Sequence, residues 1–293
     1  MGRNTYVSDL SYADDVALLA NSYEELQRMI DSVQLYATAV GMQINAAKTK
    51  VLSALIPTAD KRPIVVNGSR VDEVESFKYL GSSFLPSGQV DGEINNRIGL
   101  AGSAFARLKS CLWSRREISL RTKARVFQSV VRTILLYGCE TWPVRVEDLR
   151  RMEVYDNDSV RYICSVRRID RVRLVDLQQL LRLQPISSII LRNRLRWFGH
   201  AVRRPEGELI HDVIAPEPPA TWRMRRGGQL KTWATTVKED LALLSGPAVV
   251  GLKQWKKQWF AISAELAQDR RSWSASIRDV INARGCASET VIR

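Results

Sequence analysis

Cysteine and histidine are scarce in this 293-residue chain. The four cysteines are far apart and form no Cys-x-x-Cys pair: Cys111, Cys139, Cys164 and Cys286. The two histidines are too isolated to complete a zinc site with them. This pattern argues against a disulfide framework and against structural zinc, and it fits reduced thiols in an intracellular protein.

Long apolar runs are also missing. No stretch approaches the ~18 consecutive apolar residues of a transmembrane helix, and the N-terminus has no apolar signal core. A membrane partner is therefore not expected. No Asp/Glu-x-Lys triplet occurs anywhere in the chain, which argues against a restriction-type nuclease. With 45% hydrophobic residues, the chain can form one or two cores, and its length suggests about two domains.

Positive charge is concentrated after residue 80. Residues 1–80 contain 8 Lys and Arg against 10 Asp and Glu, whereas residues 81–293 contain 36 against 21. Residues 161–231 hold 15 basic side chains against 6 acidic ones, and 14 of the 15 are Arg. Arg suits bidentate phosphate recognition, and a basic stripe is typical of nucleic-acid binding. The alternative for any single Arg is a solvated helix face.

The most informative motif is Tyr-Ala-Asp-Asp at residues 12–15, set between apolar flanks. Two carboxylates at the tip of a strand-turn-strand can hold Mg²⁺ or Mn²⁺, which prefer hard oxygen ligands. Asp14 and Asp15 would then be metal ligands of a two-metal phosphoryl-transfer site. The alternative is a polar turn between two strands.

The pattern continues with local structure signals. Ser22 to Val40 has a capping box and helical apolar spacing, and Gly41 suits its end. Residues 51–55 predict a strand, and Asn67-Gly68 between β-branched runs predicts a hairpin. Helices are expected at 91–113, 118–137, 146–164, 173–183, 186–198, 231–244 and 250–283, with a Pro-containing linker between residues 204 and 220.

The order of these segments resembles the reverse transcriptases of LINE-type, non-LTR retrotransposons. The resemblance rests on Tyr-Ala-Asp-Asp, the following helix, Gly-Met-Gln-Ile-Asn-x-x-Lys-Thr (residues 41–49), the hairpin and Phe-Lys-Tyr-Leu-Gly (77–81). It extends to Tyr-Gly-Cys-Glu-Thr-Trp (137–142), Trp-Phe-Gly-His (197–200), the Arg-Arg-Gly-Gly segment (225–228) and Asp-Arg-Arg-Ser-Trp (269–273). It covers nearly the whole chain as the C-terminal half of such an open reading frame.

The resemblance implies an α+β fold. A partial palm at residues 1–85, with the Tyr-Ala-Asp-Asp hairpin, a helix and a small antiparallel sheet, would be followed by a mostly α-helical thumb and C-terminal region. The domains expected are a thumb at 86–203, a Pro/Arg-rich linker at 204–230 and a Trp-containing helical module at 231–293. The fingers and a further palm aspartate would lie upstream, so this chain resembles the 3′ portion of a longer coding sequence.

The family reaction is RNA-directed DNA synthesis on an RNA template and a DNA primer. The full-length parent would use dNTP as its substrate. By the same resemblance, a nuclear location is expected. By resemblance, Tyr12 would lie beneath the primer end or nucleotide, and Lys48 would donate a proton to pyrophosphate. Tyr79, Leu80 and Gly81 match the primer-grip position. The alternatives are an inward-packed Tyr12, a solvated Lys48 and a simple buried strand at residue 79.

Arginines of the thumb and tail are the candidates for nucleic-acid contact. Residues 121, 125, 128 and 132 are spaced to make one polar stripe on a thumb helix. Trp197 and Phe198 could stack bases beside neighbouring arginines, or they could belong to the core. The candidate residues are Arg121, Arg125, Arg132, Arg194, Arg196, Arg203, Arg204, Arg225 and Arg226. The main rival function is a non-catalytic nucleic-acid-binding fragment that uses this basic thumb and tail.

Overall fold

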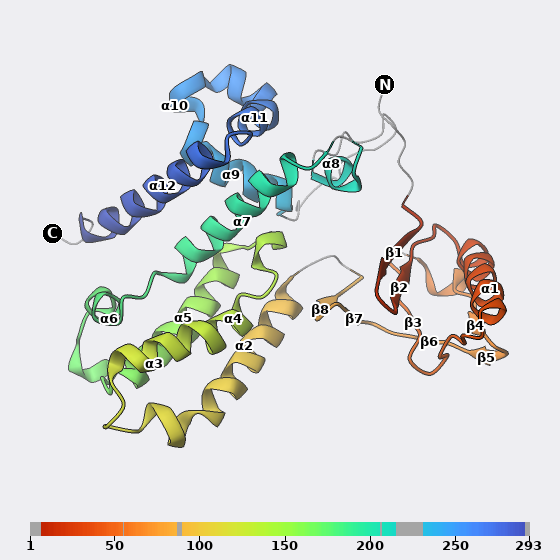
Figure 1. Cartoon of the computed structure of the whole chain (residues 1–293), viewed down its shortest axis with the longest axis horizontal. Helices are drawn as coiled ribbons and strands as arrows, with labels where there is room; N and C mark the ends of the chain where they lie inside the picture. Colours follow the sequence, from red (N-terminus) through yellow and green to blue (C-terminus); the bar gives the residue numbers. More distant parts are fainter. Residues whose placement is uncertain (1–6, 55, 87–89, 206, 215–230, 291–293) are drawn as a thin grey trace. The chain divides into compact units, whose positions relative to one another are not determined.

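The computed structural model describes residues 7–54, 56–86, 90–205, 207–214 and 231–290. The chain divides into two compact units, Met1–Gly92 and Glu93–Arg293 (Figure 1). Short strands and one helix make up the first unit, and helices make up the second. The expectation of a mixed fold that is mostly helical is therefore confirmed. No helix within the described ranges is long and apolar enough to cross a membrane.

The smaller unit contains strands of two to four residues and helix α1. The strands pair as β1–β2, β4–β5 and β7–β8, all antiparallel, and as the parallel pair β3–β6. The expected single antiparallel sheet is therefore wrong in detail, because the described strands form four separate two-stranded ladders. The elements are β1 (Asp9–Tyr12), β2 (Asp15–Leu18), α1 (Tyr23–Ala39), β3 (Lys50–Val51), β4 (Val65–Val66), β5 (Ser69–Arg70), β6 (Asp72–Glu73), β7 (Phe77–Tyr79) and β8 (Ser82–Phe84), with a 3-10 turn at Thr58–Asp60.

Helix α1 is fixed at its start and along one face. The Ser22 hydroxyl accepts a hydrogen bond from the Glu25 amide at 3.1 Å, which satisfies one of the free N–H groups of the first turn. The Gln27 side chain donates to the Val65 carbonyl and accepts from the Val65 amide, so it occupies an edge of β4 as a neighbouring strand would. Ile30 and Val66 are buried in the same small core. The predicted helix is confirmed, and it holds the β4–β5 hairpin in place.

The larger unit follows the predicted helices closely, with the short helices α8 and α10 as additions and with one predicted helix divided. The predicted helix at 250–283 is two helices separated at residues 267–269, and helix α8 lies inside the stretch expected to be a linker. The elements are α2 (Asp91–Arg107), α3 (Leu120–Val126), α4 (Thr133–Leu135), α5 (Val146–Ile163), α6 (Leu174–Leu181), α7 (Ile186–Val202), α8 (Leu209–Ile214), α9 (Trp233–Ser245), α10 (Pro247–Val250), α11 (Leu252–Leu266) and α12 (Arg270–Thr290), with π-helical turns at Lys109–Trp113 and Phe127–Arg132 and 3-10 turns at Cys139–Thr141 and Arg168–Asp170.

Helix α7 shares one core with the C-terminal helices. Leu195 and Phe198 of α7 are fully buried with Leu241 of α9, and Trp273 of α12 packs on the same cluster. Helix α7 and the C-terminal helices therefore lie in the same compact unit, and the domain boundaries expected near residues 203 and 231 stay predictions. Trp273 also lies against α7 at Gly199, where an added Cβ would collide with the indole ring.

Candidate active site at the Tyr-Ala-Asp-Asp turn

The Tyr-Ala-Asp-Asp motif forms the turn of the β1–β2 hairpin. Tyr12 pairs with Asp15 across the two strands, and Ala13 and Asp14 make the two-residue connection. Ala13 has φ +53°, a left-handed conformation that an L-residue other than Gly or Asn adopts at a cost of about 1–2 kcal/mol. Asp14 lies in the turn itself and Asp15 begins β2, and both side chains are exposed. The hairpin therefore presents two adjacent carboxylates to solvent.

These carboxylates suit a divalent cation only as part of a larger site. Their oxygens are the hard ligands that Mg²⁺ and Mn²⁺ prefer, and Mg²⁺ is commonly held by one or two carboxylates, waters and substrate phosphates. Within the described residues, no three or more His, Cys, Asp or Glu side chains gather where they could hold a metal ion. The turn fits one side of a metal site that substrate phosphates and another protein ligand would complete.

The β7–β8 hairpin is held against the β1–β2 hairpin. The Tyr79 hydroxyl donates a hydrogen bond to the Leu10 carbonyl at 3.1 Å, which joins β7 to β1 across 69 residues of sequence. The connecting residues Leu80 and Gly81 have φ +48° and +83°. Gly tolerates that conformation, whereas Leu is strained in it. Residues 77–84 thus form a hairpin whose turn exposes Leu80, at 41% of its surface; the primer-grip role of this hairpin stays a prediction.

Two other residues of the predicted site are exposed in the same unit. Tyr12 is 66% exposed, so the inward-packed alternative does not hold. Lys48 lies in a turn in which its amide donates to the Asn45 backbone and side-chain oxygens, and its own side chain is exposed. The position therefore matches the alternative of a solvated lysine, and no contact among the described residues joins Lys48 to Asp14 or Asp15.

The thumb-helix arginines separate into two groups. Arg121 and Arg125 are exposed on α3. Arg132 is 3% exposed, and its Nε and Nη2 donate to the buried Asp156 carboxylate at 2.8 and 2.6 Å. Its Nη1 donates to the Gln184 carbonyl. The expectation that Arg132 belongs to an exposed stripe is wrong, because the π-helical turn at Phe127–Arg132 changes the helical phase on which that stripe depended.

Arg194 is a second correction, since it lies in the core rather than on a nucleic-acid surface. It is 3% exposed and pairs with Asp240 at 2.5 Å. Of its neighbours, Arg196 is exposed, half-buried Arg203 donates to the Ala267 carbonyl, and exposed Arg204 pairs with Glu208. The predicted residues Arg225 and Arg226 lie outside the described residues.

The aromatic residues near these arginines belong to the interior. Phe198 is fully buried against the rings of Phe260 and Trp273, and Trp197 packs edge-on against Trp233. The core alternative is the correct one for Phe198, and base stacking is not available to it. Cys111, Cys139 and Cys164 are free thiols.

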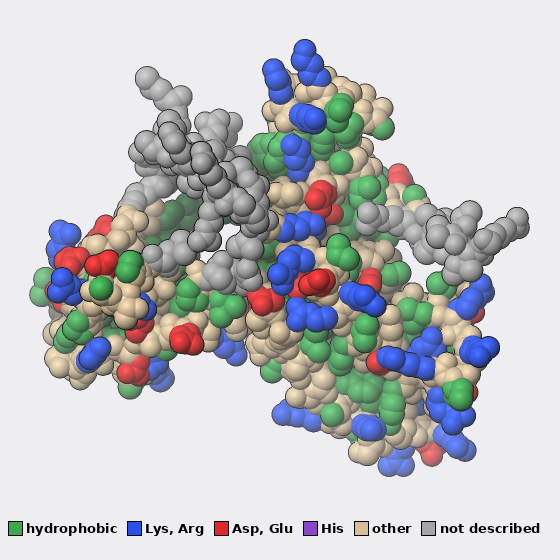
Figure 2. Space-filling view, turned by 180° about the vertical axis from the view of Figure 1, so that it is seen from behind, with side chains coloured by type: hydrophobic (Ala, Val, Ile, Leu, Met, Phe, Trp, Pro, Cys, Tyr) green, Lys and Arg blue, Asp and Glu red, His purple; other side chains and the backbone are tan. Residues whose placement is uncertain are grey.

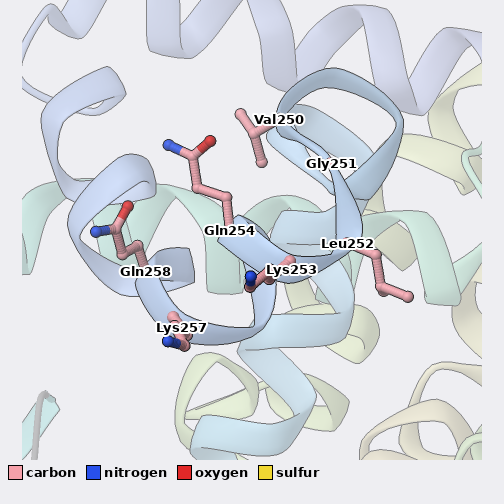
Figure 3. A pocket seen from close by; sticks show the side chains of 7 residues that line it. All are labelled: Val250, Gly251, Leu252, Lys253, Gln254, Lys257 and Gln258. Carbon is pink, nitrogen blue, oxygen red and sulfur yellow. The ribbon is translucent and has the colours of Figure 1, made fainter.

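A hollow of about 400 Å³ lies at the junction of α10 and α11. One continuous stretch of chain forms it, and Lys253, Gln254 and Lys257 are among the side chains around it (Figure 3). None of the residues predicted from the sequence to act in catalysis or in nucleic-acid contact lines it. It carries no carboxylate, histidine or cysteine, so we assign no chemistry to it.

Comparison with known proteins gives a family match that lies within the smaller unit. Residues 5–84 match the reverse transcriptase (RNA-dependent DNA polymerase) family, and this match ends at the last residue of β8. A putative uncharacterized transposon-derived protein of Caenorhabditis elegans is 24% identical over 94% of this chain and 96% of its own length. No solved structure matches the chain.

Two relatives from Drosophila melanogaster carry functional names. The RNA-directed DNA polymerase from the mobile element jockey is 24% identical over 52% of this chain. A probable RNA-directed DNA polymerase from transposon BS is 25% identical over 76% of it. The matches cover only 18% and 25% of those two proteins. The resemblance to LINE-type reverse transcriptases is therefore confirmed, and the chain corresponds in length to the nematode protein rather than to the whole fly polymerases.

Proposed function

We propose that residues 7–86 form the C-terminal part of a polymerase palm, in which Asp14 and Asp15 hold divalent metal during RNA-directed DNA synthesis. The observation that carries the proposal is the hairpin geometry: two adjacent carboxylates at an exposed turn, in the segment that matches the reverse transcriptase family. Asp14 would be the principal ligand and Asp15 the supporting one. Lys48 is the candidate general acid for the leaving group.

The bound metal, Mg²⁺ or Mn²⁺, would supply Lewis acidity toward the reacting phosphate oxygens. The residues of this chain position the substrate. Tyr12 immediately precedes the turn and is exposed, so it can contact the primer end or the incoming nucleotide. The hydrogen bond from Tyr79 to Leu10 fixes the second hairpin beside β1, which would hold a primer strand near the carboxylates.

The strained turn at Leu80 supports this role for β7–β8. Asn67, at the β4–β5 turn, has a similar φ of +50°, but Asn adopts that conformation readily and serves as an ordinary hairpin residue. Leu80, unlike Asn67, has a side chain that does not favour a positive φ, and it is partly exposed. Strain that is retained at an exposed apolar position is typical of a surface that contacts a ligand.

We further propose that the chain alone does not catalyse polymerisation, because too few carboxylates gather at the turn among the described residues. The test is primer extension on an RNA template with Mg²⁺ or Mn²⁺. It compares the 293-residue chain with a form extended by an upstream fingers and palm segment. The extended form should extend the primer and the chain alone should not.

Two substitutions then test the turn itself. Asp14→Asn in the extended form should reduce extension by at least about a thousandfold, since metal-site electrostatics supply several kcal/mol. Asp60→Asn is the matched control, because Asp60 is an exposed carboxylate of the same unit. Mn²⁺ binding, followed by electron paramagnetic resonance, should weaken in Asp14→Asn only. Extension by the chain alone would contradict its incompleteness, and full activity of Asp14→Asn would contradict the metal site.

A second candidate function is nucleic-acid binding without turnover. The observation that favours it is the pair Arg121 and Arg125, exposed four residues apart on α3 and in no ion pair among the described residues. Arg121→Gln with Arg125→Gln should then weaken binding of a primer-template duplex. This double variant is measured in the binding experiment described in the next section.

A further inference from the structure

A basic groove of about 780 Å³ lies between α7 and α12 in the larger unit. The two helices pack directly on each other, since the Trp273 indole N–H donates to the Leu195 carbonyl at 3.0 Å (Figure 1). Ser274 and Ile277 line part of the groove, and five arginines line the rest. The groove arginines are Arg192 and Arg196 from α7 and Arg270, Arg271 and Arg278 from α12.

The groove arginines differ from many other arginines of the same unit. Arg145, Arg168, Arg173 and others are matched to carboxylates two to three ångströms away. In the described part of the chain, no carboxylate forms an ion pair with any groove arginine. In the view of Figure 2, basic side chains outnumber the acidic ones interspersed with them over the larger unit. The positive charge of the groove is therefore not neutralised by the fold.

The positions of these arginines are unfavourable for the helices that carry them. Arg270 and Arg271 occupy the first turn of α12, where the helix dipole favours negative charge. The carboxylate of the preceding Asp269 also lies at this helix end, where it accepts from the Arg271 and Ser272 amides. Arg192 and Arg196 are like charges four residues apart, which oppose each other. Burial, and then the nearby Arg196, lowers the pKa of Arg192 from its ordinary value. The Arg192 Nη1 donates to the Gln184 Oε1 at 2.8 Å, whereas its Nε is buried without a hydrogen-bond partner among the described residues.

Other residues of the same segments account for the folding of α12. Asp269 accepts hydrogen bonds from the Arg271 and Ser272 amides and so caps the helix. Trp273 anchors the helix on Gly199 of α7. The exposed guanidinium groups of Arg270 and Arg271 add nothing to this packing. An anionic ligand gives these arginines a role that the fold does not.

We propose that the groove between α7 and α12 binds the phosphate backbone of a nucleic-acid strand. The four-residue spacings from Arg192 to Arg196 and from Arg270 through Ser274 to Arg278 advance about 6 Å per step, so each helix carries a row of donors along the groove. No aromatic side chain lines the groove, so it offers no base stacking, and contacts to backbone phosphates alone carry no direct information on base sequence. Ile277, its one apolar lining residue, is 2% exposed, which leaves nothing to insert into a lipid surface. The proposal does not depend on the polymerase site.

The test is fluorescence anisotropy of the full 293-residue chain with labelled single-stranded RNA, single-stranded DNA and duplex DNA, over a salt series. Arg196→Gln with Arg278→Gln removes one exposed arginine from each helix. Arg115→Gln with Arg116→Gln is the matched control, because both lie exposed in the loop before α3. Arg121→Gln with Arg125→Gln tests the α3 surface. A thermal melt of each variant checks that the fold is retained.

If the groove binds phosphate, the groove double variant should lose roughly tenfold in affinity per contact at 50 mM salt. Its slope of log K against log salt should flatten by about 1.4 on single strands and 1.8 on duplex DNA. The strand type with the larger loss identifies the preferred source of phosphate, and the control should bind as the unmodified chain does.

Three results would overturn the proposal. The first is an unchanged slope in the groove double variant. The second is an equal loss in the Arg115/Arg116 control, which would show a general charge effect. The third comes from a parallel measurement of binding to phosphatidylserine vesicles. If the groove variant loses vesicle binding without any loss of nucleic-acid binding, the groove is assigned to a membrane surface.

Discussion

Replacing Gly199 by Ala should destabilise the larger unit through a single added methyl group. A Cβ at this position would lie 2.3 Å from the Trp273 Nε1 and 2.6 Å from its Cδ1, against ordinary carbon contact distances of about 3.5–4.0 Å. It would also lie 3.0 Å from the Arg203 Nη1. The indole therefore has to move by about 1 Å, away from the Leu195 carbonyl to which it donates.

The size of the effect follows from three contributions. Overpacking costs about 1–3 kcal/mol, and a buried indole N–H without its acceptor costs about 1–3 kcal/mol. Exchange of Gly for Ala inside a helix returns about 0.5–1 kcal/mol. A net loss of about 3 kcal/mol corresponds to a fall of roughly 6–12 °C in melting temperature for a unit of this size. Circular dichroism at 222 nm measures it.

The same substitution in α2 is the matched control. Gly102 lies inside a helix, and the nearest atom to an added Cβ is the Tyr155 Cε2 at 3.9 Å. Gly102→Ala should raise stability by about 0.5–1 kcal/mol. The Gly199→Ala cost should also shrink once Trp273 is replaced by Leu, since neighbouring sites couple. If both Gly→Ala variants melt at or above the unmodified temperature, the packing of α12 on α7 described above is incorrect.

Two more predictions concern buried groups. Arg132→Gln should lower the free energy of unfolding by about 3–5 kcal/mol, because it leaves the Asp156 carboxylate buried without its partner. The control variant Arg125→Gln should change it by no more than about 0.5 kcal/mol. Similar urea midpoints for the two variants would show that Arg132 is on the surface. Burial raises the pKa of the Cys139 thiol to about 11. At pH 8 this thiol should therefore remain protonated and unreactive toward a thiol reagent, while the exposed Cys111 reacts. Rapid labelling of Cys139 in a Cys111→Ser variant, measured by mass spectrometry of the native protein, would show that Cys139 is not buried.

Local signals in the sequence were sufficient for the parts of the fold that depend on neighbouring residues. Ser22 and Glu25 predict the start of α1, and the structure shows the hydrogen bond that the pattern implies. Asn67 and Gly68 predict a two-residue hairpin, and both have positive φ. In each case the interacting groups are within four residues, so the sequence contains the whole interaction.

Interactions between distant residues could not be predicted in the same way. The pairs Arg132 with Asp156 and Arg194 with Asp240 join residues that are 24 and 46 positions apart, and each converts a seemingly exposed arginine into a buried one. The π-helical turn at Phe127–Arg132 adds a further shift that α-helical periodicity does not contain. Positive charge alone therefore identifies a basic region but does not separate its structural arginines from those that can reach a ligand.

The Asp-Arg-Arg-Ser-Trp segment shows how the structure makes that separation. Asp269 and Trp273 are explained by the helix that they cap and anchor, and Gly199 is explained by the approach of that tryptophan. Arg270 and Arg271 are not explained by any of these contacts, and they occupy a helix end that disfavours their charge. A motif whose other members are required by the fold thus leaves two arginines whose position is best accounted for by an anion outside the chain. This argument rests on the contacts of each residue and not on the basic composition of the region.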